Sequence, residues 1–309
     1  MQTSSTAGSF SAVSIVLGAV LIGSSPILIR LSELAPTATA LHRVALAVPA
    51  LALAMLLWRT DDARQAQPLS SADRLLMIGG GALFALDLIC FHWSLAYTSV
   101  ANSVLFLNFA PVFAGLLAWA MFGERLSAGF LASLALALLG VGLLVGGHAG
   151  IDGGRLLGDV LALAAGAFYG AYLLMVNRLR RRTSTLAIMT YTTAACAICL
   201  LPVVLASGER LIPVTAAGIG VLLALALLIH VLGQGLIAYA LRVLPAASSS
   251  TLLLQPLVAT VAAWLVFSES LGALQLLGGA ILLAGVYMCR RLSPPLNHPE
   301  ADRAATAAP

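Results

Sequence analysis

The chain has 309 residues, of which 61% are hydrophobic and 9% are charged, with a formal net charge of +4. A typical soluble domain carries roughly 25% charged residues, so the composition excludes a soluble enzyme or a nucleic-acid-binding domain. The excess apolar surface must face lipid, and the composition therefore predicts an integral membrane protein.

Ten apolar stretches are long enough to cross a bilayer as α-helices, which takes about 20 residues. They lie at about 10–30, 37–58, 74–95, 99–122, 127–147, 156–177, 184–205, 214–238, 247–267 and 272–290. The connections are short, so no soluble domain is expected. Residues 1–9 carry no positive side chain and no clear cleavage site follows a short apolar run, so we read the first apolar segment as a retained helix, with residues 1–9 as an N-terminal tail. Residues 292–309 are rich in Pro and Ala and predict a disordered cytoplasmic tail.

One segment occurs twice. Pro111–Leu126 reads PVFAGLLAWAMFGERL and Pro256–Leu271 reads PLVATVAAWLVFSESL, so Pro, Trp, Phe and Glu recur at the same spacing. The copies fall in the fourth and ninth predicted helices, an odd number of segments apart, so they should cross the membrane in opposite directions. The sequence thus predicts two inverted five-helix repeats, residues 10–148 and 155–291. Membrane proteins built this way are most often transporters.

Arginine placement predicts the orientation. The chain contains no lysine, and all 16 of its Lys or Arg residues are arginines. With a cytoplasmic N-terminus, inner loops and the tail hold most of them, Arg43 lies inside a segment, and outer loops hold only Arg30, Arg155 and Arg210. Positive residues accumulate on the cytoplasmic side. We therefore expect a multi-pass protein of the cell (inner) membrane with both termini in the cytoplasm.

The residues around the repeat carry a family resemblance. Phe91–Leu126, with its Pro…Trp…Glu pattern, resembles the EamA-type branch of the drug/metabolite transporter superfamily. Gly233–Leu271 resembles the matching part of the second EamA repeat, and Gly23–Ala47 is similar to the first two helices of a repeat. The resemblance implies ten helices, cytoplasmic termini, and export or exchange of small metabolites. Arg125 departs from the repeat, since Ser270 stands at the matching position, which fits an outward-facing second junction.

Two charged side chains are predicted at membrane depth, where charges are costly and often functional. Asp87 lies about 20 Å along the third predicted helix and has no charge within one turn of its own helix. It could exchange protons, bind a substrate amine, or pair with Arg43 or a histidine. Arg43, next to His42, could bind a carboxylate through its planar fork. The alternatives are an ion pair with Glu33 or Asp87, or a position reaching the outer interface.

His230 and Gln234 are four residues apart, so on an α-helix they share one face. The inverted repeat would place them across the midplane from Asp87, around a central cavity. His230 could titrate near neutral pH or form a hydrogen bond to a neighbouring helix.

Asn108 and Gln255 stand beside Pro111 and Pro256, which interrupt helices and free backbone carbonyls. Their amides could line a cavity or satisfy those carbonyls. Trp93 could hold a substrate cation on its ring face or anchor its helix at the interface.

Glu124 and Glu269 recur at the junctions that end the two copies. We expect a structural role for them together with Pro111 and Pro256. A carboxylate at such a position can accept hydrogen bonds from the N-terminal amides of the next helix.

These features favour a secondary transporter of small metabolites, such as amino acids or related polar or amphipathic compounds. It would act as an exporter or exchanger by alternating access, driven by protons or by the gradient of the substrate. ATP use through a P-loop is excluded, because the GxxxxGK[ST] motif needs a lysine. The alternatives are efflux of cationic drugs or amines, an intramembrane enzyme, and a non-transporting scaffold.

Catalysis is not expected, because the sequence holds no clustered nucleophile and base at membrane depth. No cofactor, metal or nucleic-acid partner is expected either. Cys196 and Cys199 form a CxxC inside an apolar segment without further metal-ligand spacing, so we read the cysteines as small apolar residues. The expected partners are a small-molecule substrate, the lipid bilayer and protons, and the protein is expected to be a monomer or homodimer.

Overall fold

The computed structural model describes residues 3–57, 70–122, 127–146, 153–180, 182–243, 251–269 and 272–292. The described residues are mostly helical and contain no strand. Seven of their helices are long and apolar enough to cross a membrane, and three shorter apolar helices accompany them. The predicted all-α membrane fold is therefore confirmed. The tail predicted at 292–309 lies outside the described residues, except that Leu292 ends the last helix.

The first half of the chain contains α1 (Thr3–Arg30), α2 (Pro36–Ala45), α3 (Ala47–Leu57), α5 (Ser71–Tyr97), α6 (Val100–Leu107), α7 (Ala110–Phe122) and α8 (Ala128–Gly146). The second half contains α9 (Gly153–Leu179), α10 (Thr185–Ser207), α11 (Ala216–Leu223), η1 (Ala224–Gly233), α12 (Gln234–Val243), α13 (Leu254–Phe267) and α14 (Ala273–Leu292). Because α1 begins at Thr3, most of the tail predicted at 1–9 is helical instead. No proline stands between Thr3 and Ser9 to stop the helix.

Local capping chemistry explains where several helices begin. The Ser70 hydroxyl accepts a hydrogen bond from the Asp73 amide, and the Asp73 carboxylate accepts one from the Ser70 amide, which together form a capping box at the start of α5. Single side-chain caps begin α6, α10 and α11 at Ser99, Ser184 and Thr215.

The two repeat prolines occupy equivalent places. Pro111 is the second residue of α7, after a break at Asn108 and Phe109, and Pro256 is the third residue of α13. The first turn of a helix tolerates proline, because its missing amide would have no partner there. Each proline therefore lies at the start of a helix, and no described helix continues through either one as a kink.

The eighth predicted segment contains a feature that its sequence does not reveal. Between α11 and α12 the backbone of η1 is wound as a ten-residue π-helix. Such segments, with i→i+5 hydrogen bonds, are rare and are frequently found at functional sites. This winding changes which side chains of the segment face the same direction.

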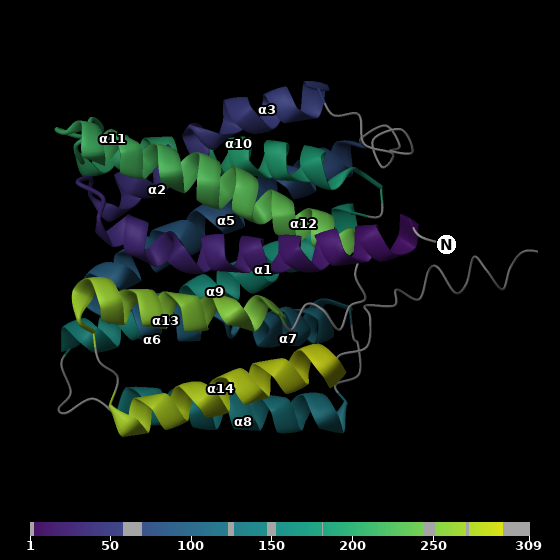
Figure 1. Ribbon diagram of the computed structural model, residues 1–309, viewed down its shortest axis with the longest axis vertical. Helices are drawn as coiled ribbons and strands as arrows, with labels where there is room; N and C mark the ends of the chain where they lie inside the picture. The colour runs from purple at the N-terminus through teal and green to yellow at the C-terminus, as the bar shows by residue number, and fades with distance from the viewer. Residues whose placement is uncertain are drawn as a thin grey trace, which may run out of the picture.

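Figure 1 shows the helices stacked side by side, with α3 at one end of the stack and the pair α8 and α14 at the other. The pair packs at small residues: a Cβ at Gly278 would lie 2.8 Å from the Leu144 nitrogen, and one at Gly285 2.6 Å from the Ala137 nitrogen. Close backbone approach of this kind is how membrane helices associate without a hydrophobic driving force.

The helix ends meet on two sides of the bundle. Arg30, at the end of α1, contacts Leu95 and Thr98 at the end of α5 and Glu269 after α13. Glu269 also contacts Val100, where α6 begins. We call this the far side, and the side on which α1 begins the N-terminal side (Figure 1).

Candidate functional site

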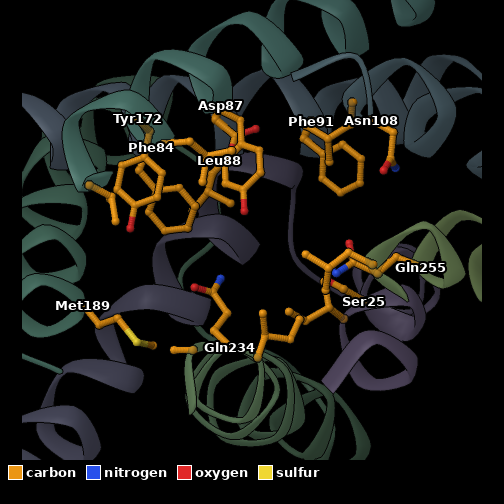
Figure 2. Close-up of a pocket in the computed structure, with 18 of the residues that line it drawn as sticks. Ser25, Phe84, Asp87, Leu88, Phe91, Asn108, Tyr172, Met189, Gln234 and Gln255 are labelled. Carbon is orange, nitrogen blue, oxygen red and sulfur yellow. The ribbon is translucent and has the colours of Figure 1, made fainter. Parts of the chain in front are cut away.

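A cavity of about 220 Å³ lies between α1, α2, α5, α6, α9, α10, α12 and α13, so both halves of the chain line it. Five of the seven residues predicted from the sequence as candidates for binding or coupling lie on its wall: Arg43, Asp87, Asn108, Gln234 and Gln255. Figure 2 shows Asp87 on one side of the cavity and Gln234 on the opposite side.

The cavity wall contains two buried charges of opposite sign. Asp87 is 4% exposed and Arg43 is 5% exposed. The Asp87 Oδ1 and Arg43 Nε atoms have no hydrogen-bond partner. Both residues lie in the described part of the chain, where they interact electrostatically but form no salt bridge with each other. Since buried charges are costly unless their hydrogen-bonding atoms are satisfied, the site favours a ligand that brings complementary groups to these two atoms.

Aromatic rings stand beside the buried carboxylate. Phe84 stacks on Tyr172 with ring centroids 5.0 Å apart, and Tyr169 stacks on Tyr172 at 6.0 Å. All three line the cavity (Figure 2 labels Phe84 and Tyr172). Ring faces of this kind can hold an apolar or cationic group. The sequence contained a signal for this wall, because Tyr169 and Tyr172 are three residues apart on α9 and thus share a face.

Neutral polar groups complete the lining. Gln234 and Gln255 offer amide donors and acceptors, and the Ser25 hydroxyl is buried without a partner. Asn108 donates from Nδ2 to the Val104 carbonyl at 2.8 Å while it also lines the cavity. The Val104 carbonyl also accepts the Asn108 backbone amide, so it is not one that Pro111 frees, and a role of Asn108 in binding stays a prediction.

His230 and Trp93 lie outside the cavity lining. The His230 Nε2 atom is 3.0 Å from the Thr193 hydroxyl, and its ring is 5.8 Å from Phe84. Trp93 donates from Nε1 to the Thr37 hydroxyl at 2.9 Å. The structure thus separates His230 from Gln234, because the four-residue rule holds for an α-helix and His230 lies in the π-helix η1.

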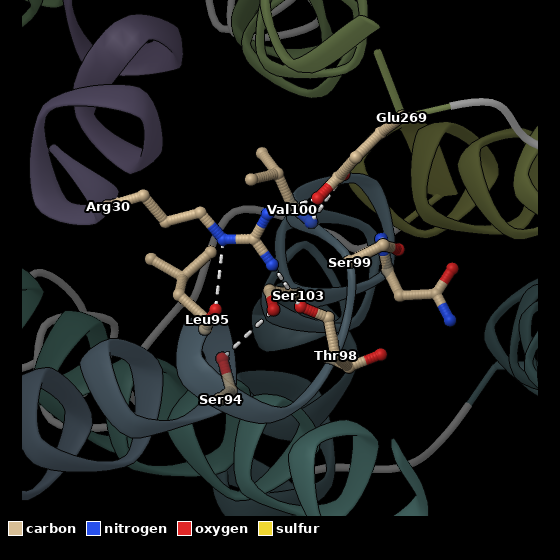
Figure 3. Close-up of polar contacts among 9 residues, drawn as sticks. Arg30, Ser94, Leu95, Thr98, Ser99, Val100, Ser103 and Glu269 are labelled. Carbon is tan, nitrogen blue, oxygen red and sulfur yellow. Dashed lines mark hydrogen bonds and ion pairs between the residues drawn. The ribbon is translucent and has the colours of Figure 1, made fainter. Parts of the chain in front are cut away.

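Of the two recurring glutamates, Glu269 is described and Glu124 lies outside the described residues. Glu269 accepts a hydrogen bond from the Val100 amide at 3.0 Å and pairs with Arg30 (Figure 3). The helix after Glu269 is capped differently, since the Gly272 amide donates to Gln275. Glu269 therefore caps a helix of the other half, whereas the sequence pattern predicted the helix that follows it.

Exposure changes along the cavity wall. Near Asp87 the lining residues Phe84, Leu88 and Phe91 are buried. Where the chain passes from α9 to α10, the lining includes Arg180, which is exposed, and Thr185, which is partly exposed. The cavity therefore approaches solvent on the N-terminal side of the bundle.

Comparison with known proteins identifies relatives. The EamA-like transporter family matches the chain twice, over residues 9–146 and 156–291. A protein of Streptantibioticus cattleyicolor named as a probable terminal-alkyne amino-acid exporter is 31% identical over 208 residues, covering 66% of this chain and 68% of its own. A transporter of Archaeoglobus fulgidus named as uncharacterized is 27% identical over 266 residues, covering 84% and 89%.

A solved structure, described only as a crystal structure of a protein, has a TM-score of 0.60 and 19% identity over 92% of this chain and 99% of that one. At this identity the likeness concerns the fold alone. The family match covers both halves of the chain and confirms the resemblance seen in the repeat residues. The chain is a multi-pass membrane protein and belongs to the EamA-like transporter family of the drug/metabolite transporter superfamily.

Proposed function

We propose that this protein exports small amphipathic amino acids by alternating access. The observation that carries the proposal is the pair of buried charges, Asp87 and Arg43, on the wall of one cavity, each with a side-chain atom that has no hydrogen-bond partner. An amino acid bears an ammonium and a carboxylate, which can bond to the unsatisfied Asp87 Oδ1 and Arg43 Nε atoms respectively. The name of the Streptantibioticus relative, a probable amino-acid exporter, supports the same substrate class.

The rest of the lining suits the remainder of such a ligand. Phe84, Tyr169 and Tyr172 offer apolar ring faces for a hydrophobic side chain. Gln234, on the other side of the cavity, can hydrogen-bond to either charged end of the ligand. A cavity of about 220 Å³ limits the ligand to a small molecule.

We further propose that the two repeats are inverted and that the N-terminal side faces the cytoplasm. Support for inversion comes from Val100 and Glu269, which bond to each other although α6 begins at the first and α13 ends near the second. Support for orientation comes from the arginines, of which Arg178, in the last turn of α9, and Arg180 and Arg182, between α9 and α10, lie on the N-terminal side. In that orientation the cavity receives substrate from the cytoplasm.

A ligand series tests the substrate class. Purified protein is heated with an amino acid that has an apolar side chain, with its amide, with its N-acetyl derivative and with the corresponding amine. A ligand that binds the folded state raises the midpoint of unfolding by mass action. We expect the free amino acid to give the largest shift and each derivative that lacks one charge to give little. Equal shifts for all four compounds would refute recognition of both charges.

Counterflow in proteoliposomes tests transport itself. Vesicles loaded with unlabelled amino acid should take up the labelled compound, and vesicles without protein should not.

Proton coupling is a separate part of the proposal, with Asp87 as the proton-binding group. An imposed pH gradient should drive uptake by wild type but not by Asp87→Asn. A transporter indifferent to the gradient in both forms would be a facilitator or an exchanger.

Efflux of cationic amines is the second candidate function. The observation that favours it is the position of Asp87 beside aromatic rings, an arrangement suited to a cation. This candidate predicts that the amine in the series binds as well as the amino acid and that Arg43→Gln leaves its binding intact. Loss of binding in Arg43→Gln would favour the amino acid.

A further inference from the structure

The far side of the bundle is held together by carboxylates. Six acidic residues lie in the described part of the chain, and Glu33, Asp159, Glu209 and Glu269 lie on the far side. We name these four the far-side clasp. Every one of them bonds to the other half of the chain.

Glu269 is a member of the clasp that forms an ion pair with an arginine. It pairs with Arg30 of α1 and accepts a hydrogen bond from the Val100 amide at the start of α6. Arg30 in turn donates to the carbonyls of Leu95 at 3.0 Å and Thr98 at 2.7 Å, at the end of α5 (Figure 3). The pair thus satisfies orphan carbonyls of one helix and an orphan amide of the next, while it joins both to α13.

Asp159, in the first turns of α9, lies next to this pair. Its carboxylate accepts hydrogen bonds from the Thr98 hydroxyl at 2.7 Å and from Asn102 at 3.3 Å. Thr98 therefore contributes its carbonyl to Arg30 and its hydroxyl to Asp159. The junction of α5 and α6 is held from two helices of the second half.

The remaining two carboxylates join loops at the edge of the far side. Glu33, between α1 and α2, accepts hydrogen bonds from the Val214 amide at 2.7 Å and from the amide and hydroxyl of Thr215. Glu209, between α10 and α11, accepts one from the Ala38 amide at 2.7 Å. Each of the two loops therefore contributes one carboxylate that binds the start of a helix in the other half.

An apolar layer separates the clasp from the cavity. Ile27, Phe91, Leu95, Val100 and Val104 belong to one buried cluster in which every member is at most 7% exposed. Phe91 and Val104 face the cavity, whereas Leu95 and Val100 contact Arg30 and Glu269. A ligand in the cavity could leave on the far side only after this layer and the clasp had parted.

We propose that the far-side clasp is the gate that keeps the cavity closed on that side and that must be released for the cavity to open there. The carboxylates are suited to this role because their bonds are charge-assisted and specific in direction, and because water can satisfy the same groups once the halves separate. The inference rests on the proposed alternating access, and it assigns the closed side to named contacts.

Cysteine accessibility tests the clasp without any substrate. Ser25→Cys places a thiol on the cavity wall at a site that is 3% exposed. Sealed vesicles are selected in which an N-terminal tag is protected inside, so the far side faces outward. A membrane-impermeant maleimide is added outside, and the wild-type chain with its four cysteines supplies the background.

Adding Glu269→Gln to the reporter should raise far-side labelling of Cys at position 25 by roughly tenfold, because loss of a charged hydrogen-bonding partner shifts a closed–open equilibrium by at least that factor. Asp73→Asn is the matched control, because the Asp73 carboxylate accepts hydrogen bonds only from Ser70 of its own cap in the bonds described, at 2.7 and 3.1 Å. The control should leave labelling unchanged.

Two results would contradict the proposal that the far-side clasp is a gate. One is unchanged labelling in a folded Glu269→Gln protein, and the other is an equal rise in Asp73→Asn, which would indicate general loosening. If Glu269→Gln does not fold, Glu33→Gln in the same reporter decides by the same criterion, since Glu33 lies in an exposed loop. Because labelling needs no ligand, failure to find a transported amino acid would refute the proposed function and leave this result standing.

Discussion

The two sides of the bundle differ in how their halves are joined. On the far side, acidic side chains of each half bind helix ends of the other, and Glu269 binds two elements at once. On the N-terminal side, the described carboxylate Asp73 serves the cap of its own helix, and the cavity lining reaches the exposed Arg180. An acidic side chain at a helix end can therefore stabilise its own helix, as Asp73 does, or join the two repeats, as Glu269 does, depending on where its partners lie.

The largest expected effect comes from breaking the charged end of the cavity. Asp87→Asn or Arg43→Gln should weaken amino-acid binding by roughly 30-fold or more, because truncating one partner of a buried charged contact costs about 2–5 kcal/mol. Titration of the purified variants measures the dissociation constant. Asp73→Asn, whose side chain is not part of the cavity lining, should bind like wild type, and a similar loss there would contradict a specific site.

The ion pair of the far side should show energetic coupling. Arg30→Gln and Glu269→Gln should each lower the free energy of unfolding by about 1–3 kcal/mol, the range for hydrogen bonds to charged groups. Because the side chains are in contact, the double variant should lose about 1 kcal/mol less than the sum of the singles. Unfolding in detergent measures all four proteins. Strict additivity would mean that the two residues act independently.

Adding a side chain where α1 packs closely against α13 should open the far side of the bundle. A Cβ at Gly23 would lie 2.8 Å from the Gln255 carbonyl and 2.9 Å from the Val258 Cβ, so Gly23→Ala should push α1 away from α13. We expect destabilisation of about 1–3 kcal/mol, as for other overpacked sites, and increased far-side labelling of the Ser25→Cys reporter. Gly142→Ala, which has no neighbour within 4 Å, serves as the control that should change neither.

A smaller effect is expected at the open side. Arg180 lies where the lining reaches solvent, and its charge should attract the carboxylate end of a ligand. Arg180→Gln should slow association a few-fold at low salt, by about 2–5 times, and the difference should shrink as salt rises. Stopped-flow binding measures it. Arg182→Gln, on an exposed arginine outside the lining, should have less effect, and an equal one would point to general surface charge.

The smallest expected effect concerns pH. Hydrogen bonds from the Thr215 hydroxyl and the Val214 amide hold the pKa of Glu33 below its ordinary value of 4.5. A depressed pKa stabilises the fold above the unfolded-state pKa, and this contribution is lost as the pH falls through the folded-state pKa. The difference in melting temperature between wild type and Glu33→Gln should therefore be constant above about pH 5.5 and should shrink below 4.5. A difference that widened in acid would contradict this assignment.

Much of the membrane architecture could be predicted from the sequence, because hydrocarbon demands long apolar helices. Asp87 and Arg43 could be singled out for the same reason, since a charge is conspicuous in an apolar segment. The structure places both on the cavity wall, and their role in binding stays a prediction. The break after Ala45 was harder to predict, because the residues on both sides are apolar, whereas an interruption beside Pro111 was expected from the sequence.

Other features depend on partners far away in the sequence. Arg30 and Glu269 are 239 residues apart, and nothing local to Glu269 shows that its carboxylate turns toward α1 and α6. The aromatic wall escaped notice because α9 is apolar over much of its surface, so periodicity does not indicate which face points inward. The orientation of His230 required knowledge of the backbone winding, which side-chain spacing presumes to be α-helical.

That winding has a consequence for the protein's tolerance of sequence change. An α-helix turns by about 100° per residue, so the number of residues stored in η1 fixes the rotation of α12 about its own axis. Deleting one residue from 224–233 and rewinding the segment would swing Gln234, Ile237 and Ala238 off the cavity wall together. The number of residues in η1 therefore determines which face of α12 points into the cavity. This effect comes from the backbone and does not depend on which apolar side chains η1 carries.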